Sequence, residues 1–171
     1  MNRTVGIWGG IALPVWGLAL LFLTGCAQTL QYPPFPDQAK RVEDPAKARI
    51  YLIRKEKVFG SAVGLQFYGS EPDAAVGPLA GAGSKMRLIG EVGPGSYLCW
   101  EESPRAFKYS KIEHDRDSVE TINLKAGNVY YLRAYLHSGW TTVTARVKQI
   151  DEKEGQELLK HCEPPKDYLK K

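Results

Sequence analysis

The apolar positions of the chain fall into short runs separated by Gly, Pro and charged residues, a pattern typical of β-strands joined by turns. The run at residues 49–54 (RIYLIR) is apolar without alternation, as expected of a strand buried on both faces. At residues 141–147 apolar and polar residues alternate, as in a strand with one dry and one wet face. We expect about seven strands, at residues 49–54, 58–68, 85–92, 96–102, 118–124, 129–136 and 141–147. A hairpin is the alternative for residues 58–68.

The end of the chain changes period and predicts one helix. Acidic residues begin the segment 151–162, where they suit the positive end of a helix dipole. Leu158, Leu159 and Cys162 then share an apolar face. The predicted fold is therefore dominated by β-structure: a small β-sandwich of about seven strands with one C-terminal helix.

Residues 1–25 have the pattern of a secretory signal. Arg3 precedes an apolar run over residues 5–24, and small residues follow. The final Leu-Thr-Gly-Cys at residues 23–26 resembles the lipobox of bacterial lipoproteins, which implies that Cys26 is acylated and becomes the mature N-terminus. An uncleaved membrane helix is the alternative, since about 20 apolar residues can span a bilayer. Because Ala27 follows Cys26 where Asp would signal retention at the inner membrane, we expect an outer-membrane lipoprotein facing the periplasm.

The mature chain divides into three parts. Four prolines between Cys26 and residue 47 predict an extended tether that carries the domain away from the lipid. The alternative is that Tyr32 and Phe35 pack back on the domain. The sandwich domain is expected over residues 48–163, followed by a Lys-rich tail at residues 164–171.

Composition fits one soluble domain. The chain has 171 residues, of which 43% are hydrophobic and 25% charged. Its net charge of +4 comes from 23 Lys and Arg against 19 Asp and Glu that are dispersed along the chain. A nucleic-acid binder concentrates its basic residues on one face, so we expect no nucleic-acid partner.

Several segments resemble one known family. They are PAKA at residues 45–48, GPG at 93–95, LKAG at 124–127, YYLR at 130–133 and ELL at 157–159. Over residues 46–162 the chain resembles the bacterial lipoprotein family of domain of unknown function 2846. That resemblance implies an envelope lipoprotein with a β-rich domain and no catalytic residues. The Gly/Ala-rich stretch at residues 69–83 departs from the family pattern.

Candidate chemistry is sparse. Metal sites need several ligands that converge on one point, usually from motifs with short, paired spacings. His114, His137 and His161 do not belong to any such motif. No GxSxG elbow or activated Cys motif is present, and Glu101 and Glu102 would point to opposite faces of a strand. We therefore expect no metal, no cofactor and no enzymatic activity, with an uncharacterised envelope hydrolase as an alternative.

Two cysteines remain once Cys26 is assigned to lipid. Cys99 lies in a predicted strand and Cys162 on the apolar face of the helix. In an oxidising envelope two remaining thiols commonly pair, so we expect a disulfide that ties the helix to the sheet. The alternative is two buried thiols that act as small apolar residues.

Tyr131, Arg133 and Tyr135 share one face of the strand at residues 129–136. Tyr and Arg are enriched at binding hot spots, so this stripe is a candidate partner surface, unless a second sheet or the helix covers it. We expect a non-catalytic, lipid-anchored module that binds an envelope protein or glycan. A β-sandwich that carries or senses a small apolar ligand is the second hypothesis.

Overall fold

A computed structural model describes residues 28–55, 63–71, 85–111, 119–138 and 143–168. In these residues the strands and the helix follow in the order β1 (Leu30–Gln31), β2 (Ala48–Arg54), β3 (Leu65–Ser70), β4 (Met86–Val92), β5 (Ser96–Glu102), β6 (Ala106–Lys111), β7 (Val119–Asn123), β8 (Val129–Ser138), β9 (Val143–Ile150), α1 (Glu152–Leu159) and β10 (Asp167–Tyr168).

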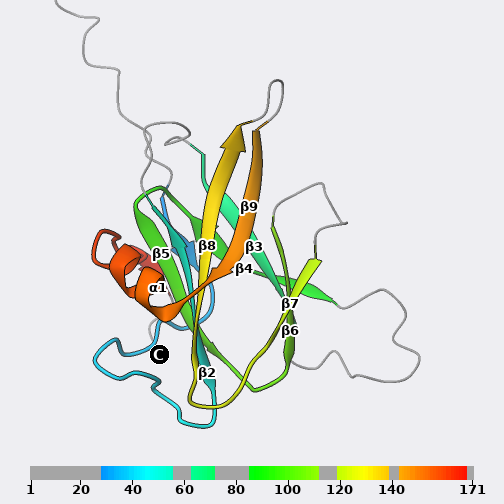
Figure 1. Cartoon of the computed structure of the whole chain (residues 1–171), viewed down its shortest axis with the longest axis vertical. Helices are drawn as coiled ribbons and strands as arrows, with labels where there is room; N and C mark the ends of the chain where they lie inside the picture. Colours follow the sequence, from blue (N-terminus) through cyan, green and yellow to red (C-terminus); the bar gives the residue numbers. More distant parts are fainter. Residues whose placement is uncertain (1–27, 56–62, 72–84, 112–118, 139–142, 169–171) are drawn as a thin grey trace, which may run out of the picture.

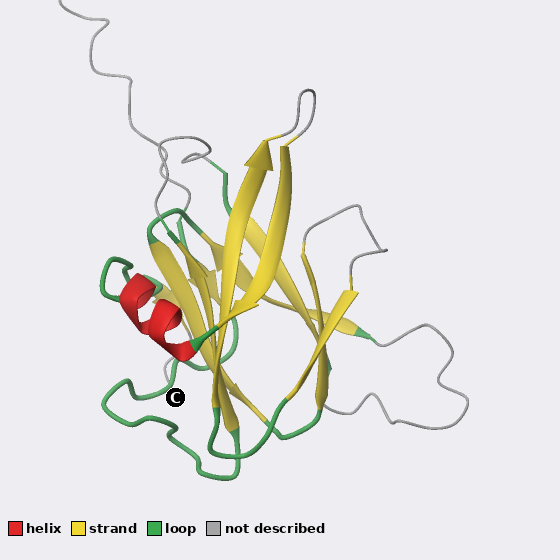
Figure 2. Cartoon of the chain, viewed as in Figure 1, coloured by secondary structure: helices red, strands yellow, loops and turns green. Residues whose placement is uncertain are grey.

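The strands form two sheets, as the sequence predicts (Figures 1 and 2). The larger sheet has the order β10-β1-β4-β3-β6-β7, and the smaller has the order β5-β2-β8-β9. In the smaller sheet β2 pairs antiparallel with β5 and parallel with β8, and β8 and β9 form an antiparallel hairpin. The fold is therefore a two-sheet, mostly β sandwich with one helix near its C-terminus.

The core lies between the two sheets. Because side chains alternate along a strand, Ile50, Leu98 and Leu132 face inward from the smaller sheet. They meet a cluster of aromatic rings from both sheets, in which neighbouring centroids lie 5.7–6.5 Å apart: Phe67, Trp100, Phe107 and Tyr109. Burial of these side chains contributes to the hydrophobic stabilisation of the sandwich.

A third layer covers the opposite face of the smaller sheet. Tyr51, Tyr97 and Tyr131 point outward there and pack against Leu158 of α1. Phe35, from the segment that precedes β2, lies against Tyr97 with ring centroids 6.1 Å apart. With both faces covered, all seven residues of β2 are buried, which confirms the prediction for RIYLIR.

The helix and the turns agree with the sequence analysis. Asp151 caps α1 by accepting a hydrogen bond from the Glu154 backbone N–H, and Leu158 is buried. Gly95 and Gly127 have φ values of 69° and 72° in the two predicted turns, a conformation that favours glycine. In the described ranges no helix is long and apolar enough to cross a membrane, and the predicted signal segment lies outside those ranges.

Two parts of the chain differ from the sequence prediction. No strand was predicted between residues 102 and 118, but β6 occupies residues 106–111 and buries the rings of Phe107 and Tyr109. The free tether predicted for residues 26–47 is also wrong over its described part. Leu30 and Gln31 form β1, which pairs with β4, and Phe35 packs on the domain while Tyr32 remains 47% exposed. Proline excludes regular hydrogen bonding locally but does not prevent apolar side chains between prolines from packing.

The edge of β5 is closed by side-chain and backbone bonds from both ends of the chain. The Gln31 amide accepts from the Cys99 N–H at 2.8 Å and donates to the Cys99 carbonyl at 2.7 Å. Glu163, after α1, donates its N–H to the Gly95 carbonyl and accepts from the Tyr97 N–H. These bonds satisfy backbone groups that an uncovered sheet edge would leave unpaired.

We expect Gln31→Ala to lower the free energy of unfolding by about 2 kcal/mol, because two buried backbone groups of Cys99 lose their partner. Urea denaturation of the wild type and the variant measures the loss. Gln149→Ala, which removes the same side chain from an exposed position of β9, serves as the control and should change stability by less than about 0.5 kcal/mol. Equal effects of the two changes would contradict the role assigned to Gln31.

Candidate functional site

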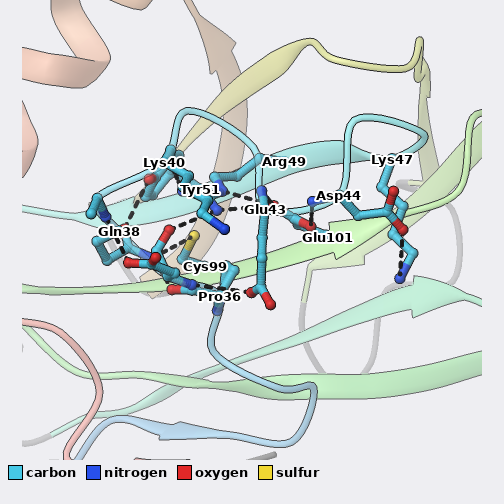
Figure 3. A network of polar contacts seen from close by, with 12 residues as sticks. Pro36, Gln38, Lys40, Glu43, Asp44, Lys47, Arg49, Tyr51, Cys99 and Glu101 are labelled. Carbon is cyan, nitrogen blue, oxygen red and sulfur yellow. Dashed lines mark hydrogen bonds and ion pairs between the residues drawn. The ribbon is translucent and has the colours of Figure 1, made fainter.

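The outer face of the smaller sheet carries a buried ion pair near the start of β2. Arg49 and Glu101 lie on β2 and β5 at directly paired positions, so their side chains share one face. Arg49 Nη2 is 2.9 Å from Glu101 Oε1, and the two side chains are only 1% and 8% exposed. Figure 3 shows the pair enclosed by the segment that leads into β2.

The remaining bonding capacity of this pair holds that segment in place. Arg49 also donates to the carbonyls of Asp37 and Lys40, at 3.0 and 2.6 Å. Glu101 accepts the backbone N–H groups of Glu43 and Asp44, at 2.6 and 3.1 Å. Both charges are thus satisfied within the protein, and the pair fastens residues 37–44 to the sheet.

Next to the ion pair lies a partly buried group of polar contacts around Cys99 (Figure 3). The Tyr51 hydroxyl donates to Gln38 Oε1 at 2.9 Å, and Gln38 Nε2 lies 3.6 Å from Cys99 Sγ. Burial raises the pKa of the Cys99 thiol to about 12 and that of Tyr97 to about 12. At neutral pH Cys99 is therefore a protonated thiol, which is a poor nucleophile.

The predicted disulfide between Cys99 and Cys162 is absent. Both cysteines belong to the outer-face cluster, but they lie at different heights along β5. Cys162 Sγ approaches the carbonyl of Arg54 at 3.7 Å, and Arg54 pairs with Ser96. Ser96 is three residues from Cys99, about 10 Å along the strand, so Cys162 contacts the sheet well away from Cys99 and both thiols are free.

The proposed partner stripe is divided by the helix. Tyr131 is 6% exposed, stacks on Tyr51 with ring centroids 5.4 Å apart, and lies under Gly155 of α1. Arg133 Nη1 is 2.8 Å from Glu154 Oε1 of the helix. The alternative that the helix covers this face thus holds for Tyr131 and largely for Arg133, and Tyr135 beyond the helix remains half-buried.

A second charged cluster occupies the opposite side of β5, and the sequence analysis missed it. Glu102 is 3% exposed and forms ion pairs with Arg87 and Arg105. Arg105 also donates to the carbonyls of Ser70 and Glu71. Glu101 and Glu102 do lie on opposite faces, as predicted, and their alternation was the only sequence signal for two separate clusters.

The histidines form no metal site in the part of the chain that the structure describes. His114 lies outside the described residues, and the side chain of His137 is not described. His161 is exposed and its Nε2 lies 3.6 Å from Glu157 Oε1. Across the described ranges no three His, Cys, Asp or Glu residues gather in an arrangement that could hold a metal ion.

An accessible part of the outer face lies midway along the β8–β9 hairpin. Tyr135 pairs with Arg146 and Arg133 pairs with Lys148, so cross-strand alternation puts all four side chains on this face. Arg146 and Lys148 are exposed. From Val129 to Ile150 the sequence contains no Asp or Glu. The alternation at residues 141–147 indicates a wet face for Arg146, and pairing that strand with residues 129–136 across their turn would have placed Arg146 beside Tyr135.

We expect Glu101→Gln to lower the free energy of unfolding by about 3 kcal/mol. The change leaves Arg49 buried without its counter-charge, and an amide offers one acceptor where two backbone N–H groups need one each. Thermal and urea denaturation measure the loss. The matched control is Glu157→Gln, which breaks an exposed pair with Lys160 and should cost less than about 0.5 kcal/mol. If Glu101→Gln is as mild as the control, the pair does not hold the segment.

We expect the two thiols to differ sharply in reactivity. Because the pKa of Cys99 lies about three units above the ordinary value of 9.0, its thiolate fraction at neutral pH falls about 1000-fold. Iodoacetamide should therefore modify half-buried Cys162 in the native protein and leave Cys99 intact, as measured by peptide mass spectrometry. In denaturant both thiols should react without reductant, and a requirement for reductant would restore the disulfide.

No protein-family model, curated protein or solved structure compared with this chain matches it. The resemblance to the family of domain of unknown function 2846 therefore stays a prediction from sequence.

Proposed function

We propose that the protein is a lipid-anchored module of the bacterial cell envelope that binds a partner and catalyses no reaction. The observation that carries the proposal is the direct entry of the chain into the sandwich. Thr29 is 6% exposed and its hydroxyl accepts from the Gly93 N–H at 2.9 Å, and Gln31 is 1% exposed. A folded domain thus begins three residues after the lipobox-like Cys26.

The proposed anchor has a definite mechanical consequence. A single acyl chain holds a protein weakly, whereas several chains together give stable attachment. With acyl chains on Cys26, the sandwich would sit close to the membrane surface rather than on a stalk. The sequence after Cys26 favours the outer membrane, with the domain in the periplasm.

A binding role is favoured over catalysis by the state of the reactive groups. Cys99 is buried with a raised pKa, and Glu101 and Glu102 are each engaged by Arg residues. These groups act in folding. Half-buried Tyr135 and exposed Arg146 and Lys148 have the composition of a recognition surface, because Tyr and Arg are enriched at binding hot spots.

The alternative of a carrier for a small apolar ligand requires space between the sheets. In the described residues that space contains the packed rings of Phe67, Trp100, Phe107 and Tyr109. This packing gives the carrier hypothesis no support, and the hydrolase alternative has no observation in its favour.

The N-terminal peptide tests the anchor. We expect protein from native membranes to begin at Cys26 with a mass increased by diacylglycerol and an amide-linked acyl chain. Cys26→Ser should retain residues 1–25 and carry no lipid, whereas Cys162→Ser should be processed like the wild type. A wild-type chain that begins at Met1 with unmodified Cys26 would refute the anchor and make residues 5–24 a membrane helix.

A further inference from the structure

The N-terminal entry and the β8–β9 hairpin lie at the same end of the sandwich. The Thr29 hydroxyl contacts Ser96 Oγ, and Ser96 pairs with Arg54 at the end of β2. Since β8 runs parallel to β2, with Ile53 paired to Arg133, the later residues of β8 extend past that end. Figure 1 shows the hairpin rising beyond the neighbouring strands on the side where β1 begins.

The three-residue link from Cys26 to Thr29 and the part of β8 that extends past the end of β2 have similar lengths. Cys26 is three residues before Thr29, so its Cα lies at most about 10 Å from that of Thr29. Ala134 follows Arg133 and stands level with Arg54, and β8 continues four residues further to Ser138, about 13 Å. The hairpin therefore extends at least as far from the sandwich as the linker allows Cys26 to go.

Charge on the hairpin suits an anionic surface. Arg146 and Lys148 are exposed on its outer face, and Lys55 is exposed directly after β2 at the same end. Acidic residues at this end include Glu154, which is engaged by Arg133, and Glu91 and Glu163 beside the β4–β5 turn. Asp167 pairs with Leu30 next to the N-terminal entry, and Glu56 follows Lys55 in the sequence. The hairpin itself has no acidic residue, so its own field is positive.

We propose that the β8–β9 hairpin rests on the anionic phospholipid headgroups of the membrane that holds the anchor, with Arg146 and Lys148 as its contacts. This inference rests on the proposed acylation of Cys26. It assigns the charged face of the hairpin to lipid rather than to a protein or glycan, because the short linker keeps this end of the sandwich close to the membrane that holds Cys26. Basic residues next to an anionic leaflet are attracted within about a Debye length, close to 10 Å.

The test compares two lysines at different distances from this end of the sandwich: Lys148 is level with Arg133, close to the end of β2, and Lys125 precedes β8. Lys148 lies on the proposed contact face, and Lys125 is exposed in the turn before β8, at the other end of the sandwich. Full-length lipidated protein is reconstituted in vesicles of phosphatidylethanolamine and phosphatidylglycerol. A membrane-impermeant amine reagent is then applied, and labelling at each lysine is read by peptide mass spectrometry against the same protein in neutral detergent.

We expect vesicles to slow labelling of Lys148 at least about threefold while Lys125 is unchanged, because only Lys148 faces the headgroups. Vesicles of neutral phosphatidylcholine should give weaker protection. Arg146→Glu should reduce the protection of Lys148, whereas the matched reversal Lys125→Glu should leave it intact. This pair of variants separates a specific contact from general crowding at the vesicle surface.

The possible failures are distinct. Lys148 labelled as fast as Lys125 on lipidated, vesicle-bound protein overturns the inference and leaves the anchor standing. Protection of Lys148 in native membranes but not in pure lipid vesicles also overturns it, in favour of a protein or glycan partner. Cys26 without lipid, detected in the same mass spectra, refutes the proposed function itself.

Discussion

The buried backbone groups at the outer edge of β5 require hydrogen-bond partners. Segments from both ends of the sandwich domain supply them. Gln31 supplies a side-chain amide that copies a neighbouring strand at Cys99, and Glu163 supplies backbone groups beside Gly95 and Tyr97. Because these two segments flank the sandwich in sequence, closing one strand edge fixes where the chain enters and where it leaves α1. The position of the N-terminus therefore follows from a requirement of sheet pairing.

The buried ion pair gives this arrangement its third layer. Removing Arg49 and Glu101 from water is costly, and the cost is offset only because backbone groups of residues 37–44 complete their bonding. Apolar residues at both positions could pack as tightly, but they would not specify where that segment runs. We regard the pair as a determinant of register for the N-terminal segment, and Phe35 and Tyr97 then pack in the geometry it sets.

The sequence predicted those elements whose own residues show a clear hydrophobic or charge pattern. The apolar run of β2, the alternation in β9 and the acidic start of α1 all correspond to observed elements. β6 was missed because its polar side chains outnumber the two rings that it buries, Phe107 and Tyr109. β1 and the contacts of Gln31 depend on partners some sixty residues away, which a local pattern does not encode. The predicted disulfide was wrong for a related reason. An oxidising compartment favours pairing of two thiols, but the positions of the cysteines in the fold decide whether they can meet.

Among the described residues β9 is the last strand of the smaller sheet, at the edge opposite β5. With the lipid anchor proposed above, copies on a membrane would be confined to two dimensions and would collide often. Two hairpins that approach edge to edge would bring their Arg146 and Lys148 side chains together, and like charges disfavour strand pairing. The same residues that suit an anionic surface would thus keep neighbouring copies apart and preserve a dispersed population at high surface density.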